Sequence, residues 1–517
     1  MSRFNESTKG INTTVNHEGA VAYKMNSEME LYTLVCTFAM QDKFYESASE
    51  QMKRLRDLIT KVSPVFVAKL AVYAREQMYL RTVPIILTVE LAKFHKGDDL
   101  VSRMVKKVLQ RADEIGELLS YYQIANDRTG TKKLDKVSNQ IKNGIREVFE
   151  AGKFNEYQFA KYNRSTDVRL RDALFLTHPK PQSDEQKSLF DKIAADTLET
   201  PYTWEVQLSE LGKKDSSIEA KRTLWEELID SEKLGFMALL RNLRNIIKVE
   251  VSQEHINKVC DTLSNPELVR KSKQFPFRFL SAYRSLIGPY ERFGSNTESD
   301  LNKRYVNLVI EALEKAVLVS AEQVPSFENA IFATDVSGSM QQLVSPKSVI
   351  QMYDIGTVLC MMTYLHSKGS VTGMFGDTWE VFNFPKKNIL RNANEVHQLE
   401  GRVGYATNFH RVIEWALRQS ENYDYLFAFT DTQMWDTDDV YYSKRTNEVV
   451  SKWNLYKKKN PKAKLILMDM GGYSTTPIDI KNNDIYLVSG WSDRVLSILK
   501  QLMEGDSVLN EINRIEI

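Results

Sequence analysis

The sequence predicts two kinds of structure in one chain: an all-α region followed by an α/β domain with a mostly parallel sheet. From about residue 328, apolar runs alternate with amphipathic stretches, which is typical of a parallel sheet covered on both faces. Before that point strand patterns almost vanish, and a chain of 517 residues is too long for one core. We therefore predict a helical domain over 1–322 and an α/β domain over 323–517, whose C-terminal tail is free to pack on the helical domain.

Six strands and four helices are predicted in the α/β domain. The strands are Ala330–Thr334, Val371–Phe375, Glu380–Phe384, Tyr425–Thr430, Ala463–Asp469 and Asp484–Val488, and the helices are Met352–Leu365, Asn408–Arg418, Lys444–Lys457 and Ser492–Met503. Ligands in such sheets bind beyond the carboxyl ends of the strands. Polar residues at these ends are therefore candidates for a functional site.

The first 322 residues carry apolar stripes at helical spacing. One stripe comprises Val67, Leu70, Ala71, Ala74 and Met78, and another comprises Phe236, Leu240, Leu243 and Ile247. Polar loops separate such helical pieces. Successive helix pairs of this kind indicate an α-solenoid, although the repeat has no fixed period.

Oxygen-bearing side chains follow two of the predicted strands and one loop. Asp335, Ser337 and Ser339 come directly after the first strand, and Gly338 lets the backbone turn between them. Thr407 precedes a predicted helix and Asp431 ends the strand that begins at Tyr425. Hard oxygen ligands of this kind suit Mg²⁺ or Ca²⁺. The alternative is that each residue only caps the helix that follows it.

This Asp-x-Ser-x-Ser, Thr, Asp order resembles the metal-ion-dependent adhesion site of von Willebrand factor A domains. The resemblance implies that Ser337 and Ser339 bind the metal directly, Thr407 in one state, and Asp335 and Asp431 mainly through water. It implies Mg²⁺ first, with Ca²⁺ or Mn²⁺ left open, and a partner's carboxylate completing the octahedron. The family's threonine loop is often rich in glycine, whereas Tyr405 and Ala406 precede Thr407 here.

Basic residues of the helical region are arranged in stripes, although the formal net charge of the chain is only +1. Arg241, Arg244 and Lys248 form a stripe opposite an apolar one. A second group is crowded into one segment: Lys161, Arg164, Arg169, Arg171, His178 and Lys180. Such groups can follow the phosphates of a nucleic-acid backbone. The alternative for each is an ordinary solvated helix face.

Several segments resemble the TROVE domain of the Ro ribonucleoprotein family. They are 17–20 (HEGA), 73–76 (YARE), 81–84 (RTVP), 176–181 (LTHPKP), 202–205 (YTWE) and 275–283 (FPFRFLSAY), and an A domain follows them, as in that family. The resemblance implies a ring of HEAT-like helical repeats closed by the A domain. It also implies binding of small structured RNAs called Y RNAs and of single-stranded ends of misfolded non-coding RNA.

Residue by residue, the family resemblance extends to Lys161, Arg164 and His178 as RNA contacts, although the spacing from Arg164 to His178 differs slightly from the animal pattern. Arg171, Lys180, Arg241, Arg244 and Arg278 are further candidates, and Arg284 is preferred to the aromatic rings around it. Bacterial relatives are similar to adaptors that bring RNA to an exoribonuclease. A ring closed within one chain also implies a monomer.

Two other functions compete with a non-catalytic RNA-binding protein. One is a protein-interaction scaffold whose A domain docks an acidic partner. The other is a phosphohydrolase with Asp335 as nucleophile, which the sequence disfavours because Ser337 stands where the general acid would be needed. We therefore predict no enzyme.

The chain begins with a polar segment, contains no apolar run long enough for a bilayer, and has three cysteines far apart in sequence. These features predict a cytoplasmic protein without disulfides.

Overall fold

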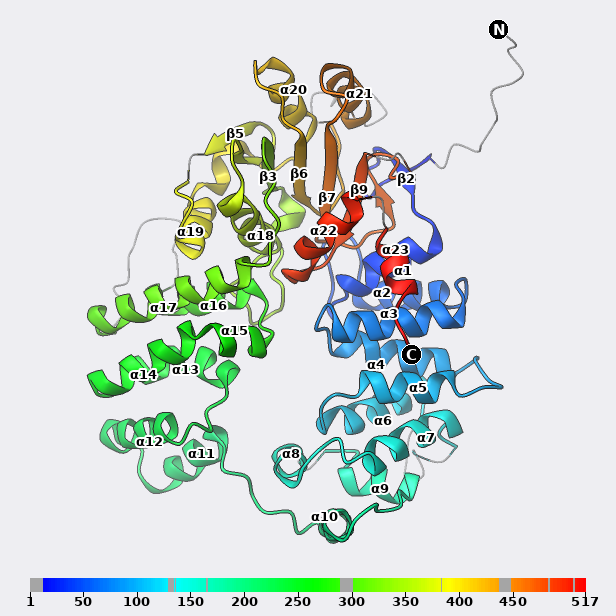
Figure 1. Cartoon of the computed structure of the whole chain (residues 1–517), viewed down its shortest axis with the longest axis vertical. Helices are drawn as coiled ribbons and strands as arrows, with labels where there is room; N and C mark the ends of the chain where they lie inside the picture. The colour runs from blue at the N-terminus through cyan, green and yellow to red at the C-terminus, as the bar shows by residue number, and fades with distance from the viewer. Residues whose placement is uncertain are drawn as a thin grey trace. The chain divides into compact units, whose positions relative to one another are not determined.

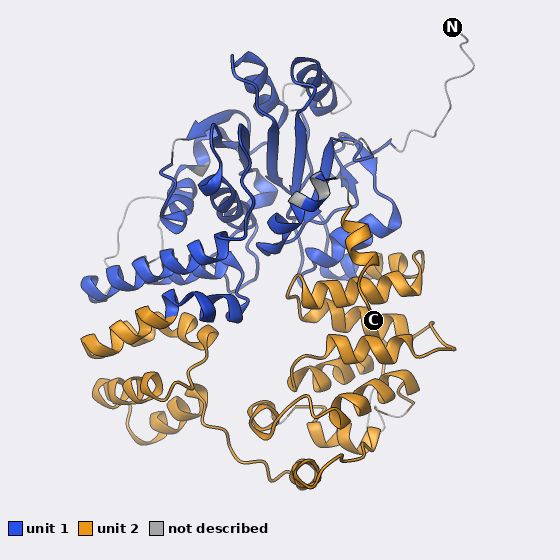
Figure 2. Ribbon diagram, in the orientation of Figure 1, with its two compact units in different colours: residues 1–52, 263–506 blue, residues 53–262, 507–517 orange. Residues whose placement is uncertain are grey.

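The computed structural model describes residues 13–128, 134, 136–163, 166–288, 301–382, 384–436, 448–481, 484–504 and 507–517. Within these ranges the chain forms two compact units (Figure 2). The first unit contains residues 1–52 and 263–506, and the second contains residues 53–262 and 507–517.

The first unit is built on a six-stranded sheet with the order β5-β4-β3-β6-β7-β9 (Figure 1). Its strands are β3 (Ala330–Asp335), β4 (Val371–Phe375), β5 (Trp379–Phe382), β6 (Tyr425–Thr430), β7 (Lys464–Asp469) and β9 (Ile485–Ser489). All neighbouring strands are parallel except β4 and β5. All six predicted strands are therefore present; β4 and β6 have the predicted ends, and the ends of the other four are shifted by one or two residues.

Helices cover the sheet. They are α18 (Met352–His366), α19 (Ile389–Leu399), α20 (His410–Arg418), α21 (Val449–Lys459) and α22 (Arg494–Met503), with the short 3-10 helices η1 (Gly338–Gln341) and η2 (Glu400–Val403). Alternate residues of each central strand face opposite sides, so Ile331 and Ala333 join the core beneath α20 and α21. Helix α18 packs on β3, β4 and β6. Helix α19 was not predicted, and α21 begins at Val449, whereas the predicted start of that helix at Lys444 lies outside the described residues.

Three further elements of the first unit come from the beginning of the chain. They are β1 (Thr13–Val15), β2 (Val21–Lys24) and α1 (Ser27–Cys36). Strand β2 pairs with β1 and with β8 (Thr475–Thr476) in a separate three-stranded antiparallel sheet. Strand patterns almost vanish before residue 320 in the sequence, and the described residues of that region contain only the two short strands of this segment. Its strands are too short to show period-two alternation, and a pairing partner 450 residues away leaves no local pattern.

The helices α15 (Pro266–Ser272), α16 (Pro276–Ile287) and α17 (Lys303–Ala321) also belong to the first unit. Helix α16 packs against α17, α18 and α19. The compact units therefore do not follow the boundary expected at residue 322, although the change from helical to α/β structure does fall there.

The second unit is all-α and is built of successive helices. They are α3 (Pro64–Glu76), α4 (Thr82–Ala92), α5 (Leu100–Val108), α6 (Asp113–Ala125), α7 (Asn139–Glu150), α8 (Glu156–Tyr162), α9 (Leu170–Thr177), α10 (Asp184–Ala195), α11 (Trp204–Lys214), α12 (Ile218–Asp230) and α13 (Phe236–Lys248). Helices α2 (Ala48–Ile59) and α14 (Gln253–Ser264) contain the boundaries between the units. The C-terminal helix α23 (Val508–Asn513) packs on α3.

None of the helices in the described ranges has both the length and the apolar composition that crossing a bilayer requires. Cys36 and Cys360 are buried free thiols, and Cys260 is a half-buried one.

Candidate functional site

The carboxyl ends of β3 and β6 bring two aspartates to the same edge of the sheet. The strands are neighbours and parallel, with Thr334 opposite Phe429. Asp335 is the last residue of β3, and Asp431 follows β6 directly. The hydroxyl of Thr430 donates to Asp335 Oδ2 over 2.5 Å. Thr430 therefore supports the site, and the sequence reasoning missed it because it was read only as a strand residue.

The loop after β3 folds back on its own aspartate. The Ser337 amide donates to Asp335 Oδ1 over 2.9 Å, which closes a tight turn. The hydroxyls of Ser337 and Ser339 then lie 3.4 Å apart, and the Ser339 hydroxyl also interacts with the Asp431 carboxylate. All four side chains are buried. The two carboxylates and two hydroxyls that the sequence analysis singled out therefore lie in one cluster.

Thr407 lies on a neighbouring loop that is held to the first one by its backbone. The Gly338 amide donates to the Tyr405 carbonyl over 2.9 Å, and the Asn408 amide donates to the Gly376 carbonyl over 3.0 Å. Thr407 is 3% exposed, whereas the Tyr405 side chain is 46% exposed. Tyr405 contributes a carbonyl, which any residue supplies, so the lack of glycines does not separate the loops.

Burial and mutual repulsion raise the pKa values of the carboxyl groups in the cluster. Burial raises the pKa of Asp335, and burial together with the negative charge of Asp335 raises the pKa of Asp431. Asp469, at the end of β7, adds to that field, and burial raises its own pKa to about 6 although two backbone amides donate to it. Two buried carboxylates beside buried hydroxyls form an all-oxygen donor set, which fits a hard divalent cation.

Residues from the start of the chain also line this site. A cavity of about 10 Å³ is bounded by Ser339 and Asp431 on one side and by Lys43, Tyr473 and Trp491 on others. The Lys43 ammonium donates to the Gly471 carbonyl over 2.7 Å. Sequence reasoning missed Lys43 because it lies almost 300 residues before Asp335 and belongs to no local motif.

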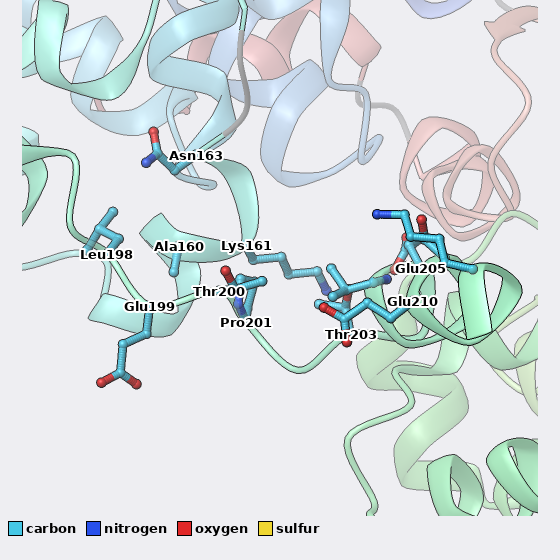
Figure 3. Close-up of a pocket in the computed structure, with 13 residues that line it drawn as sticks. Ala160, Lys161, Asn163, Leu198, Glu199, Thr200, Pro201, Thr203, Glu205 and Glu210 are labelled. Atoms are coloured by element: carbon cyan, nitrogen blue, oxygen red, sulfur yellow. The ribbon is translucent and has the colours of Figure 1, made fainter.

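The predicted RNA-contact residues of the second unit lie on its surface where they are described. Lys161, on α8, lines a cavity of about 530 Å³ between α8 and the start of α11, and its side chain extends toward Thr203 (Figure 3). Three carboxylates share this cavity, those of Glu199, Glu205 and Glu210. The surroundings of Lys161 are therefore mixed in charge. Arg164 lies outside the described residues.

The other candidates of this unit are on α9 and α13. Arg171, His178 and Lys180 are exposed, and His178 ends α9 in a left-handed conformation with φ 46°. Arg241 and Arg244 are exposed on α13, on the side opposite its buried leucines and isoleucines. The surface positions required for contact with a phosphate backbone are therefore present at all five residues.

The two candidates on α16 differ. Arg278 is exposed beside the Phe277 ring, with its guanidinium carbon 5.2 Å from the ring centre. Arg284 is only 8% exposed and forms a two-pronged ion pair with Asp354 of α18, over 2.6 and 2.7 Å. The expectation that Arg284 contacts RNA is therefore wrong, because its charge is already satisfied inside the unit.

This architecture, a helical-repeat region followed by an A domain with a carboxylate–hydroxyl cluster, is that of a defined class of protein. The TROVE domain model matches residues 25–199 and 195–331, and the Ro60 vWA domain model matches residues 329–503. The chain belongs to the TROVE-domain family, and its fold class is the one that the sequence predicts.

The relatives found by comparison support the same assignment. The chain is 25% identical over 341 residues to telomerase protein component 1 of Rattus norvegicus, covering 50% of this chain and 13% of that protein. It is 46% identical over 89 residues to the Mus musculus protein of the same name, covering 17% of this chain and 3% of that one. The chain thus spans only a small part of these relatives.

A solved structure shows the same fold. The crystal structure of the Deinococcus radiodurans RO (RSR) protein matches with a TM-score of 0.58 and 15% sequence identity, over 92% of this chain and 100% of that one.

Proposed function

We propose that this protein is a non-catalytic RNA-binding ribonucleoprotein component. Its ligands are small structured non-coding RNA of the Y type and the single-stranded ends of misfolded non-coding RNA. It acts in RNA quality control or as an adaptor to an exoribonuclease. The match of the TROVE model over residues 25–331, followed by the Ro60 vWA model, is the observation that carries this proposal.

The physical chemistry of the second unit suits such a ligand. Its exposed basic side chains project from helices whose backbone amides and carbonyls already bond within the helix. Contact with RNA therefore depends on side-chain charge and on shape. Duplex RNA has a deep, narrow major groove that side chains do not read, which favours contacts to phosphate and ribose. Arg241 and Arg244, one helical turn apart on α13, can face successive phosphates.

Lys161 has a different role in this proposal. Because Glu199, Glu205 and Glu210 line the same cavity, a phosphate there would meet negative charge as well as the ammonium. The same three carboxylates can accept hydrogen bonds from ribose hydroxyls or base edges, and the Thr203 hydroxyl can accept or donate one. We therefore expect Lys161 to contact sugar or base, and Arg241 and Arg244 to contact the backbone.

The experiment is RNA binding by fluorescence anisotropy, with a synthetic hairpin that carries a single-stranded tail. Changing Arg241→Gln and Arg244→Gln together is expected to weaken binding at least 10-fold at physiological salt. It should also lower the slope of log K against log[salt] by about 1 to 2, since each lost phosphate contact removes about one.

The matched control is Lys458→Gln with Lys462→Gln, two exposed lysines near the end of α21 and in the loop after it. It changes net charge equally and is expected to leave affinity and slope unchanged. Equal losses in both double variants would mean that net charge alone governs binding and would refute the specific surface. Crosslinking in the native cell, with sequencing of the bound RNA, then tests whether a Y-like RNA is the ligand.

We also propose that the A domain holds a divalent cation, Mg²⁺ first, with Ca²⁺ or Mn²⁺ as alternatives. Asp335, Ser337, Ser339, Thr407 and Asp431 would hold it, directly or through water. When bound, the cation neutralises two buried carboxylates that otherwise repel each other. Among the described residues no group of three or more His, Cys, Asp or Glu side chains could hold a metal ion, so the proposed site depends on two carboxylates together with hydroxyls.

The geometry of Asp335 argues against the phosphohydrolase alternative. A nucleophilic carboxylate needs an oxygen free to attack, whereas both oxygens of Asp335 accept hydrogen bonds, from Ser337 and Thr430. Asp335 is also 0% exposed. The cytoplasmic location and the monomeric state stay predictions.

A further inference from the structure

Residues 16–45 lie against the edge of the sheet that carries Asp335 and Asp431, within the first compact unit (Figure 2). The Asn16 side chain donates to the Met434 carbonyl over 2.8 Å, and the His17 amide donates to the Gln433 side chain over 3.0 Å. Both acceptors lie just after Asp431. Pairing of β2 with β8 then holds the next residues in register. The segment is therefore built onto the site and is not a loose tail.

Three aromatic rings order this contact. His17 stacks on Tyr45 with ring centres 5.2 Å apart, and both rings meet the edge of Tyr473, at 5.1 and 5.4 Å. A side chain at Gly471 would place its Cβ 2.7 Å from the Tyr473 ring and 2.8 Å from Asp431 Cβ, so this glycine lets the ring lie directly beside the aspartate. Tyr45 is thereby held close to the carboxylate–hydroxyl cluster.

The Tyr45 hydroxyl connects the cluster to a carboxylate outside it. It donates to Glu18 Oε1 in a short hydrogen bond, and it interacts with the Ser339 hydroxyl on its other side. Burial and the negative charge of Asp431 both raise the pKa of Tyr45, so the hydroxyl keeps its proton. The result is a chain of polar groups that runs from Ser339 through Tyr45 to Glu18.

We propose that Tyr45 and Glu18 are positioning residues of the metal site. This inference rests on the proposal that the A domain holds a divalent cation. A serine hydroxyl that ligates a cation keeps its proton and directs it to a hydrogen-bond acceptor, and Tyr45 and Asp431 both lie beside Ser339. Because the Tyr45 hydroxyl donates its own hydrogen bond to Glu18, its oxygen is oriented to accept from Ser339, which leaves a lone pair of Ser339 for the cation. Outer residues of this kind typically change metal affinity by about 10- to 100-fold.

The size of the cavity supports a site completed by the chain itself. Its volume of about 10 Å³ is close to the minimum that holds one water molecule. A carboxylate from another protein does not fit there without moving side chains that line the cavity, such as Lys43 and Tyr473.

The test is Mn²⁺ binding to the full chain, measured by isothermal titration calorimetry and by the loss of the free-Mn²⁺ electron paramagnetic resonance signal. Tyr45→Phe keeps the ring and its stacking but removes the acceptor, so affinity is expected to fall about 10- to 100-fold. Glu18→Ala should match it, and Glu18→Gln, which keeps a neutral acceptor for Tyr45, should lose less. Matched controls are Tyr425→Phe on β6 and Glu28→Gln on α1, both expected to bind as the unchanged protein does.

A purely structural role predicts different results. If Tyr45 only packs, Tyr45→Phe binds Mn²⁺ with unchanged affinity, and the inference is overturned while the metal proposal stands. If the unchanged protein and Ser337→Ala bind Mn²⁺ equally weakly, the metal proposal falls and the inference falls with it. Melting of each variant in chelator shows whether a lost affinity reflects a lost fold, and Glu18→Gln, the mildest change, keeps the test open if Tyr45→Phe does not fold.

Discussion

The ion pair between Arg284 and Asp354 gives a prediction that separates stability from RNA binding. Both side chains are buried, with 9% and 0% of their side-chain surface exposed, and two hydrogen bonds join them. The Gln351 amide and the His397 ring also contact Asp354, so this carboxylate sits at the centre of the packing of α16, α18 and α19. Burial alone would raise the pKa of Asp354, but a hydrogen bond with His397 and the positive charge of Arg284 lower it.

Arg284→Met fills similar space but leaves the Asp354 carboxylate without its main partner. Breaking a buried pair in this way typically costs about 3 to 5 kcal/mol, mostly from the uncompensated charge. Replacing both residues, as Arg284→Met with Asp354→Leu, removes that charge and should recover most of the loss. The double variant is therefore expected to lose much less free energy of unfolding than the sum of the losses in the two single variants.

The assay is thermal and urea unfolding of the intact protein, followed by circular dichroism, together with anisotropy on the same RNA hairpin. Arg278→Met on the same helix is the control: it should keep the stability and lower the RNA affinity, because Arg278 is exposed. If Arg284→Met melts like the unchanged protein and loses RNA affinity instead, then Arg284 is available to RNA and the assignment of the buried pair is refuted.

Two further predictions concern the metal site. The pKa values of Asp335 and Asp431 are raised in the folded protein, so without metal, in chelator, the folded protein holds protons more tightly than the unfolded chain does. The stability contributed by these two groups is therefore highest at acid pH, near the ordinary aspartate pKa, and falls as the pH rises through the raised pKa values. Melting from about pH 4 to pH 8 should show this fall, and Asp431→Asn should flatten it; a curve that rises over the same window would contradict the burial of two charges. The second prediction is that Ser337→Ala abolishes Mn²⁺ binding and leaves the affinity for the RNA hairpin within about twofold. The reason is that the predicted RNA surface of the second unit shares no residue with the metal cluster. A folded Ser337→Ala protein that loses RNA binding would show that the two sites are coupled.

The sequence alone predicted the central sheet well, because its strands are buried on both faces. Runs such as Tyr425–Thr430 are apolar throughout, and the strand ends followed from where polarity returns. The same logic located Asp335 and Asp431, since carboxyl ends of neighbouring parallel strands must meet at one edge. Helix α19 was missed because its apolar positions alternate with asparagines, which favour turns over helices in a local reading.

The part of the site contributed by residues 16–45 could not be predicted in the same way. Asn16 and Lys43 each donate to a backbone carbonyl more than 400 residues away, and a backbone carbonyl carries no sequence identity. His17 and Glu18 had a sequence indication, within the His-Glu-Gly-Ala segment that resembles the family. That resemblance indicated the fold, and in the structure Glu18 is linked through Tyr45 to the cluster of carboxylates and hydroxyls.

Several family-like motifs prove to be structural once their side chains are placed. Arg75 is buried and forms a two-pronged ion pair with Glu114, over 2.8 and 3.0 Å, and Arg81 bonds to the same carboxylate over 3.1 Å. These arginines join α3 and the following loop to α6 and are not free to meet a phosphate. A basic residue within a shared motif is therefore weak evidence for RNA contact. The stronger candidates are cations that the fold leaves exposed, and Arg241 and Arg244 on α13 meet that criterion better than the arginines of the motifs do.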